Sequence, residues 1–141
     1  MRIKVAVCDS ARVRYFYAEK PNGQLEEEEG QTHQRSRQKE SELTTDDSGH
    51  GFNPGGGFSF GTADASKHEA QVFAREVAEK LNRAALAKKM DRLYILAPPE
   101  FLGMLRPILH SETQAVLAQT EAVNVVKEGV ERIRRHLPAF L

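Results

Sequence analysis

The chain has 141 residues, 40% of them hydrophobic and 28% charged, and its formal net charge is zero. This composition is typical of one globular domain, residues 1–141, and a zero net charge excludes a global attraction to nucleic acid or acidic lipid. No apolar run reaches the roughly 18 residues that span a bilayer. The one cysteine, Cys8, excludes an internal disulfide and favours a reducing compartment. We therefore expect a cytoplasmic protein without a membrane segment, a metal or a cofactor.

The first 33 residues predict three antiparallel strands. Ile3, Val5 and Val7 alternate with other residues, as in a strand. Residues 13–18 are rich in β-branched and aromatic residues, and the short connection makes this second strand an antiparallel neighbour of the first. A third strand is predicted over residues 24–33, where a run of four glutamates favours a solvated edge strand.

Hydrophobic periodicity is absent from about residue 34 to residue 65, where polar residues and glycine dominate. A stretch of this length predicts a long, flexible, glycine-rich loop that is either functional or disordered. Ser66 and Glu69 have the spacing of a capping box, so we expect a helix to begin at Ser66. An apolar stripe continues this helix to about Lys89.

The second half of the chain predicts helices that alternate with strands. Residues 93–97 form a short apolar run, which is typical of a strand buried on both faces. Pro98-Pro99 ends that strand and starts a helix. A second capping box predicts a short helix from Ser111 to Gln119, and a strand is predicted from Ala122 to Val126. A final amphipathic helix follows.

Three antiparallel strands followed by alternating helices and strands is the order of a ribonuclease-H-like mixed sheet with helices on both faces. A ferredoxin-like or doubly wound fold would need a helix between the first two strands, and the connection there is too short for one. The sequence therefore predicts an α/β fold of the ribonuclease-H-like class.

Five segments carry a family resemblance: residues 7–16, Gly55-Gly56-Gly57-Phe58, residues 67–69, residues 73–78 and residues 91–106. In this order they resemble the bacterial family described as protein required for attachment to host cells. That family is grouped with bacterial relatives of the middle domain of archaeal and eukaryotic release factors. The resemblance implies a release-factor-like fold shared with translation-associated domains, but it supplies no reaction.

The candidate binding residues are basic side chains and a glycine-rich segment, which together would contact phosphates and stack bases. The alternative is a mixed, solvated surface. Glycines allow close approach of a ligand, but the triplet lacks the glutamine of the release-factor loop, so we expect no peptidyl-tRNA hydrolysis. The predicted binding residues are Arg12, Arg14, Arg35, Arg37, Lys39, Gly55, Gly56, Gly57, Phe58 and His68.

The leading hypothesis is a non-enzymatic binding domain that engages ribosomal RNA or a protein partner through the glycine-rich loop. One alternative is a metal-dependent nuclease or other hydrolase centred on Asp9, because such sites place a carboxylate at the end of a strand. Asp9 has a simpler role open to it, which is bonding to the amides of its own turn. Another alternative is an adhesion-related protein that acts directly or indirectly in attachment.

Overall fold

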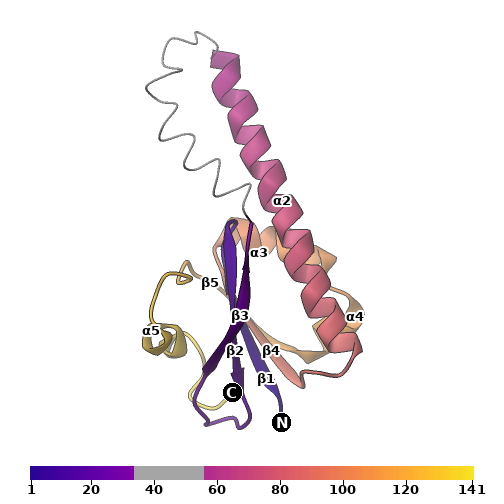
Figure 1. Ribbon diagram of the computed structural model, residues 1–141, viewed down its shortest axis with the longest axis vertical. Helices are drawn as coiled ribbons and strands as arrows, with labels where there is room; N and C mark the ends of the chain where they lie inside the picture. Colours follow the sequence, from indigo (N-terminus) through magenta and orange to yellow (C-terminus); the bar gives the residue numbers. More distant parts are fainter. Residues whose placement is uncertain (34–55) are drawn as a thin grey trace.

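The computed structural model describes residues 1–33 and 56–141, which form a mixed α/β fold with one five-stranded sheet (Figure 1). The strands are β1 (Ile3–Cys8), β2 (Arg12–Ala18), β3 (Glu26–Thr32), β4 (Arg92–Ala97) and β5 (Leu117–Ala122). The helices are α2 (Gly56–Leu86), α3 (Pro99–Leu105), the 3-10 turn η1 (Arg106–Ile108), α4 (Ser111–Val116) and α5 (Val130–Arg135).

The spatial order of the strands is β3-β2-β1-β4-β5. β2 runs antiparallel to both β1 and β3, whereas β4 runs parallel to β1 and to β5. The first three predicted strands and the central strand are therefore confirmed, and the predicted edge position of the glutamate run is confirmed as well. β1 and β4 lie at the centre because their residues are apolar on both faces.

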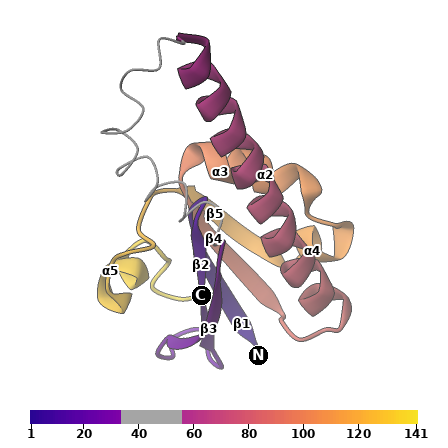
Figure 2. The same ribbon diagram turned by 45° about the horizontal axis from the view of Figure 1, so that its top comes forward.

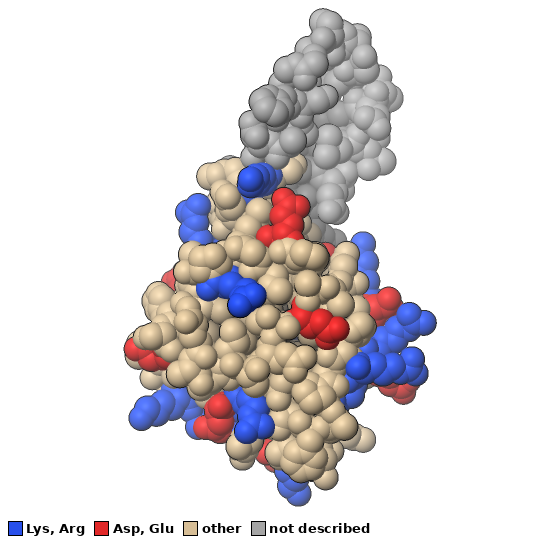
Figure 3. Space-filling model, turned by 180° about the vertical axis from the view of Figure 1, so that it is seen from behind, with Lys and Arg blue, Asp and Glu red and all other residues tan. Residues whose placement is uncertain are grey.

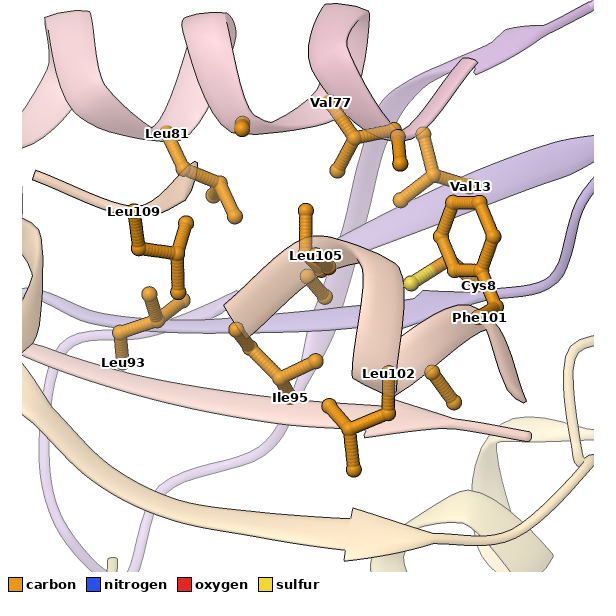
Figure 4. Close-up of a cluster of buried hydrophobic side chains, with 14 of the residues drawn as sticks. Cys8, Val13, Val77, Leu81, Leu93, Ile95, Phe101, Leu102, Leu105 and Leu109 are labelled. Carbon is orange, nitrogen blue, oxygen red and sulfur yellow. The ribbon is translucent and has the colours of Figure 1, made fainter. Parts of the chain in front are cut away.

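Two hydrophobic cores lie on the two faces of the sheet, and Figure 4 shows part of the core beneath α2. On one face, Val77 and Leu81 of α2 and Leu105 of α3 pack over Cys8 and Ile95. The opposite core lies between the sheet and α5, and its fully buried members include Phe16, Leu96 and Ile133. The sheet is thus covered by α2, α3 and α4 on one side and by α5 on the other (Figure 1).

Helix α2 begins at Gly56, ten residues before the predicted start at Ser66. The expectation of a loop through residue 65 is therefore wrong for residues 56–65, and the remainder of that loop lies outside the described residues. Glycine has the lowest helix propensity after proline, so the glycines at this helix start hide it from a sequence reading. The first part of α2 extends beyond the ends of the strands (Figure 1), and the apolar stripe in the sequence begins only after it.

The last strand also lies elsewhere than predicted. β5 spans Leu117–Ala122, whereas the sequence favoured a helix through Gln119 and a strand from Ala122 to Val126. Val125 and Val126 are buried, but in a loop that packs in the α5 core. The valines suggested a strand because they are β-branched, whereas the true strand is half exposed and lacks an apolar alternation.

Cys8 is fully buried in the core beneath α2. Burial raises the pKa of the Cys8 thiol, and the charge of Asp9 raises this pKa further. We expect a thiol reagent such as Ellman's reagent to react with the folded protein at least about 100-fold more slowly than with the denatured protein, since the reaction needs an opening of the core. Rapid, stoichiometric labelling of the folded protein would contradict this packing.

Candidate functional site

The sheet has a topological switch point between β1 and β4. The chain leaves β1 toward β2 on one side, whereas it leaves β4 toward β5 on the other side. In open α/β sheets, ligands bind in the crevice outside the carboxyl ends of the strands at such a point. A cleft of about 810 Å³ lies at this place, since it begins at Asp9, directly after β1, and at Pro98, directly after β4.

Four segments of the chain line the cleft. The turn after β1 supplies Asp9 and Ser10, and α2 supplies one wall. The start of α3 supplies a second wall, and the loop between β5 and α5 supplies the third. The remaining lining residues are Ser66, Lys67, Ala70, Pro98, Glu100, Phe101, Met104, Asn124, Lys127 and Glu128. The lining of the cleft therefore combines apolar side chains with hydroxyl, amide and charged groups.

The carboxylate of Asp9 is engaged by its own turn. Asp9 Oδ1 accepts hydrogen bonds from the amides of Ala11 at 2.8 Å and Arg12 at 2.9 Å, and the Asp9 amide donates to the Arg12 carbonyl. This confirms the turn-bonding role that the sequence offered for Asp9. One of its two carboxylate oxygens is thereby committed to holding the tight connection from β1 to β2.

Lys67 and Lys127 line the cleft on two different walls, one on α2 and one on the loop after β5. Both residues are exposed, and neither makes an ion pair with a carboxylate of the described ranges 1–33 and 56–141. The cleft has three carboxylates, those of Asp9, Glu100 and Glu128. Asp9 accepts hydrogen bonds from its own turn, and Glu128 Oε1 lies 3.9 Å from Arg132 Nη1. Glu100, the third carboxylate, is exposed at the same cleft, so the site offers both acidic and basic groups, and Lys67 and Lys127 are the groups that could contact an anion.

Arg14 holds the wall that carries Lys127. Its Nη1 donates to the carbonyls of Val126 at 2.8 Å and Glu128 at 2.7 Å, while its Nε and Nη2 donate to the two carboxylate oxygens of Glu27. The hydrogen bonds from Arg14 lower the pKa of Glu27. The stability from this pair is thus present above the ordinary pKa of glutamate and is lost as the pH falls through the lowered pKa.

Replacement of Arg14 by lysine should loosen the cleft wall, because an ammonium group cannot reproduce the planar fork of hydrogen bonds. We expect Arg14→Lys to cost about 1 kcal/mol of unfolding free energy and to speed amide hydrogen exchange in residues 123–129. Arg132→Ala is the matched control, because Arg132 is exposed and lies 3.9 Å from Glu128, so its loss should change stability little. Unchanged exchange in Arg14→Lys would contradict the clamp.

A buried hydrogen bond ties α2, the wall that carries Lys67, to the residue after β3. His33 Nε2 lies 2.7 Å from Glu69 Oε2, and both side chains are buried. The His33 ring also contacts Phe73, with ring centroids 5.4 Å apart, and the His33 amide donates to the carbonyl of Ala11. The end of β3, the turn after β1 and helix α2 are therefore tied together beside the cleft.

The other predicted binding residues divide into two groups. Arg12 lies at the start of β2, at the same end of the sheet as the cleft, and its buried Nε has no hydrogen-bond partner among the described residues. His68 is exposed on α2 beside Lys67, and Gly56, Gly57 and Phe58 belong to the first turn of this helix. Outside the described residues lie Arg35, Arg37, Lys39 and Gly55.

The charged side chains do not gather into one large basic patch on the face in Figure 3, where both signs are interspersed. The sequence reading missed Asn124 and Lys127, because it placed a strand over residues 122–126. A correct position of β5 would have revealed these two residues as the loop at the carboxyl end of a parallel strand, where ligands bind. Lys67 lies between the two residues of the predicted capping box and in a segment that carries the family resemblance, but the sequence did not predict it as a binding residue.

Two features are absent from the described residues: a cluster of metal-ligating side chains and a helix that could span a membrane. Residues 1–33 and 56–141 contain no group of three or more His, Cys, Asp or Glu side chains placed to hold a metal ion. Within the same part of the chain, none of the helices has the length and apolar character needed to cross a membrane.

Comparisons with known proteins give a family and distant structural likenesses. No curated protein matches the chain. The chain is similar to the type II variant of the Aquifex aeolicus Ppx/GppA phosphatase, at 15% identity and a TM-score of 0.40 over 86% of this chain. The aligned part is 36% of that phosphatase, so the chain spans about a third of its length. The family model described as "Protein required for attachment to host cells" matches residues 4–137. The chain therefore belongs to the family of proteins required for attachment to host cells.

Proposed function

We propose that this chain is a non-enzymatic RNA-binding domain that acts with the translation machinery in the cytoplasm, and that the cleft at the ends of β1 and β4 receives RNA phosphates. The observation that carries the proposal is the presence of Lys67 and Lys127 on two walls of one cleft, neither paired with a carboxylate of the described ranges. Ser10, Ser66 and Asn124 add hydrogen-bonding groups at its rim. Lysine side chains supply the salt-dependent part of RNA binding, because phosphate contacts release counterions.

The ribonuclease-H-like class and the release-factor relationship are part of this proposal. The strand order is β3-β2-β1-β4-β5, and β2 runs antiparallel to β1, whereas β4 runs parallel to β1. This arrangement supports the ribonuclease-H-like class. Helices on both faces of the sheet support it too (Figure 2). The glycine-rich segment and the basic residues before it, Arg35, Arg37 and Lys39, belong to the proposed RNA-binding surface on sequence grounds.

The geometry favours binding over the hydrolase alternative centred on Asp9. A metal-dependent nuclease needs several carboxylates that converge on one or two cations. Asp9 uses one oxygen for its turn, and β4 ends in Ala97 and Pro98 where a second strand-end carboxylate would stand. An adhesion-related role agrees with the name of the family, and an RNA-binding protein would act on attachment indirectly, through gene expression.

Co-sedimentation of the full chain with ribosomes across a salt series tests the proposed function. We expect binding that weakens with salt, and we expect the Lys67→Ala, Lys127→Ala double variant to reduce the slope of log affinity against log salt by roughly 1 to 2. The matched control is Lys20→Ala with Lys89→Ala, because both lysines are exposed and lie near the opposite ends of the strands.

Three outcomes of this experiment would overturn the proposal. Absence of co-sedimentation at low salt would exclude the ribosome as the partner. An affinity for ribosomes that changes neither with salt nor with the double substitution would indicate a protein partner at another surface. An equal loss of binding in the control variant would show that total charge, not the cleft, carries the interaction.

A further inference from the structure

The two edge strands of the sheet differ in their protection against pairing with another chain. The exposed β3 carries four consecutive glutamates, residues 26–29, and its pairing with β2 is interrupted by a bulge. Charges and bulges are the devices by which proteins keep an edge strand from recruiting another strand. β5 also has a bulge, at Ala118 in its pairing with β4, but it has neither lysine nor proline, and Glu121 is its one charged residue. The β5 edge is therefore the less charged of the two edges of this sheet.

β5 is also accessible. It is the last strand in the order β3-β2-β1-β4-β5, and β4 is the one element of the described chain with which it makes extensive contact (Figure 1). Ala118, Gln119 and Ala122 are exposed. The backbone N–H and C=O groups that point away from β4 thus form a template for a further strand.

The pairing with β4 shows which face of the sheet carries the side chains of residues 119–122. Gln119 and Glu121 pair with Tyr94 and Leu96, whose side chains lie in the core on the α5 side. Thr120 and Ala122 pair with Ile95 and Ala97, which lie in the core on the α2 side. An added strand must keep this alternation, because a slip of one residue would exchange the two faces.

We propose that the occupant of this edge is a second copy of the chain, whose β5 pairs antiparallel with the first so that Thr120 lies opposite Thr120 of the second copy. A two-fold axis normal to the sheet keeps the faces aligned and joins the sheets into one of ten strands. Gln119 then lies opposite Glu121 of the second copy. The amide of Gln119 is a hydrogen-bond donor to that carboxylate.

This register is self-complementary, because no like charges stand opposite each other and Thr–Thr pairs are favourable across antiparallel strands. The same operation at β3 would bring a run of glutamates against its own copy, which is unfavourable. One strand pair buries less area than a standard stable interface, so the dimer is weak and depends on protein concentration. Since the paired strands are antiparallel, the two clefts open at opposite ends of the joined sheet.

Sedimentation equilibrium across protein concentrations tests the dimer. We expect the average mass of the wild type to rise from 15.8 kDa toward twice that value with concentration. Gln119→Glu puts a carboxylate opposite Glu121 of the second copy twice per dimer and should weaken dimerisation about tenfold, whereas Gln119→Lys should strengthen it about tenfold. Circular dichroism checks that each variant keeps the fold.

The same two changes at Gln71, which is exposed on α2, are the matched controls and should leave the dissociation constant unchanged. A chain that stays monomeric at every concentration would overturn the proposal. A dimer that responds alike to Gln119→Glu and Gln119→Lys, or that responds equally to the Gln71 variants, would also overturn it. These outcomes do not depend on whether the cleft binds RNA.

Discussion

Leu81→Ala should lower the free energy of unfolding by about 3 kcal/mol, because truncation of a buried leucine loses transfer free energy and leaves a cavity. Leu81 is 1% exposed and packs between α2 and the sheet (Figure 4). Chemical denaturation monitored by circular dichroism measures the change. For a domain of marginal stability this is a large fraction of the total.

Leu86→Ala is the matched control for this prediction. Leu86 lies in the same helix and is 70% exposed, so the same truncation should change the unfolding free energy by less than about 0.5 kcal/mol. Equal effects at the two positions would contradict the packing of α2 on the sheet. A small effect at Leu81 would show that the core beneath α2 is not closely packed.

Gly30→Ala should cost about 2 kcal/mol, because the new methyl group would meet backbone that cannot yield cheaply. A Cβ placed at Gly30 would lie 2.2 Å from the carbonyl oxygen of Val13, at the bulge between β2 and β3. Relief of this contact requires the two strands to separate locally, and thermal or chemical denaturation would detect the loss.

Gly103→Ala provides the opposite control. Gly103 lies inside α3, and a Cβ there would meet nothing within 4 Å. Alanine has the higher helix propensity, so this substitution should stabilise the protein by up to about 1 kcal/mol. A neutral Gly30→Ala together with a destabilising Gly103→Ala would contradict the described positions of both glycines.

The parts of the fold that the sequence predicted are those in which local pattern and tertiary environment agree. β1 was predicted from an alternation of apolar residues and β4 from an unbroken apolar run, and Pro98-Pro99 marks the passage from β4 to α3. The start of α2 was missed because its sequence is rich in glycine, and β5 was missed because its sequence lacks an apolar alternation. Secondary structure without an apolar pattern leaves little trace in the sequence.

The candidate site was harder to predict because it depends on contacts between distant residues. Arg14 was predicted as a phosphate ligand, and the structure places its guanidinium on the carbonyls of Val126 and Glu128, more than 110 positions away along the chain. Lys67 and Lys127 come together only because α2 and the loop after β5 lie at the same end of the sheet. No local spacing encodes that neighbourhood.

The central claim is that the cleft beyond β1 and β4 is the RNA-binding site, and a titration of the ¹⁵N-labelled chain with a short single-stranded RNA tests it most directly. We predict salt-sensitive chemical-shift changes at the amides of Ser10, Ser66, Lys67, Asn124 and Lys127. Amides of β3, at the acidic edge of the sheet, should not shift. Absence of shifts at low salt, or shifts that avoid the cleft, would contradict the claim.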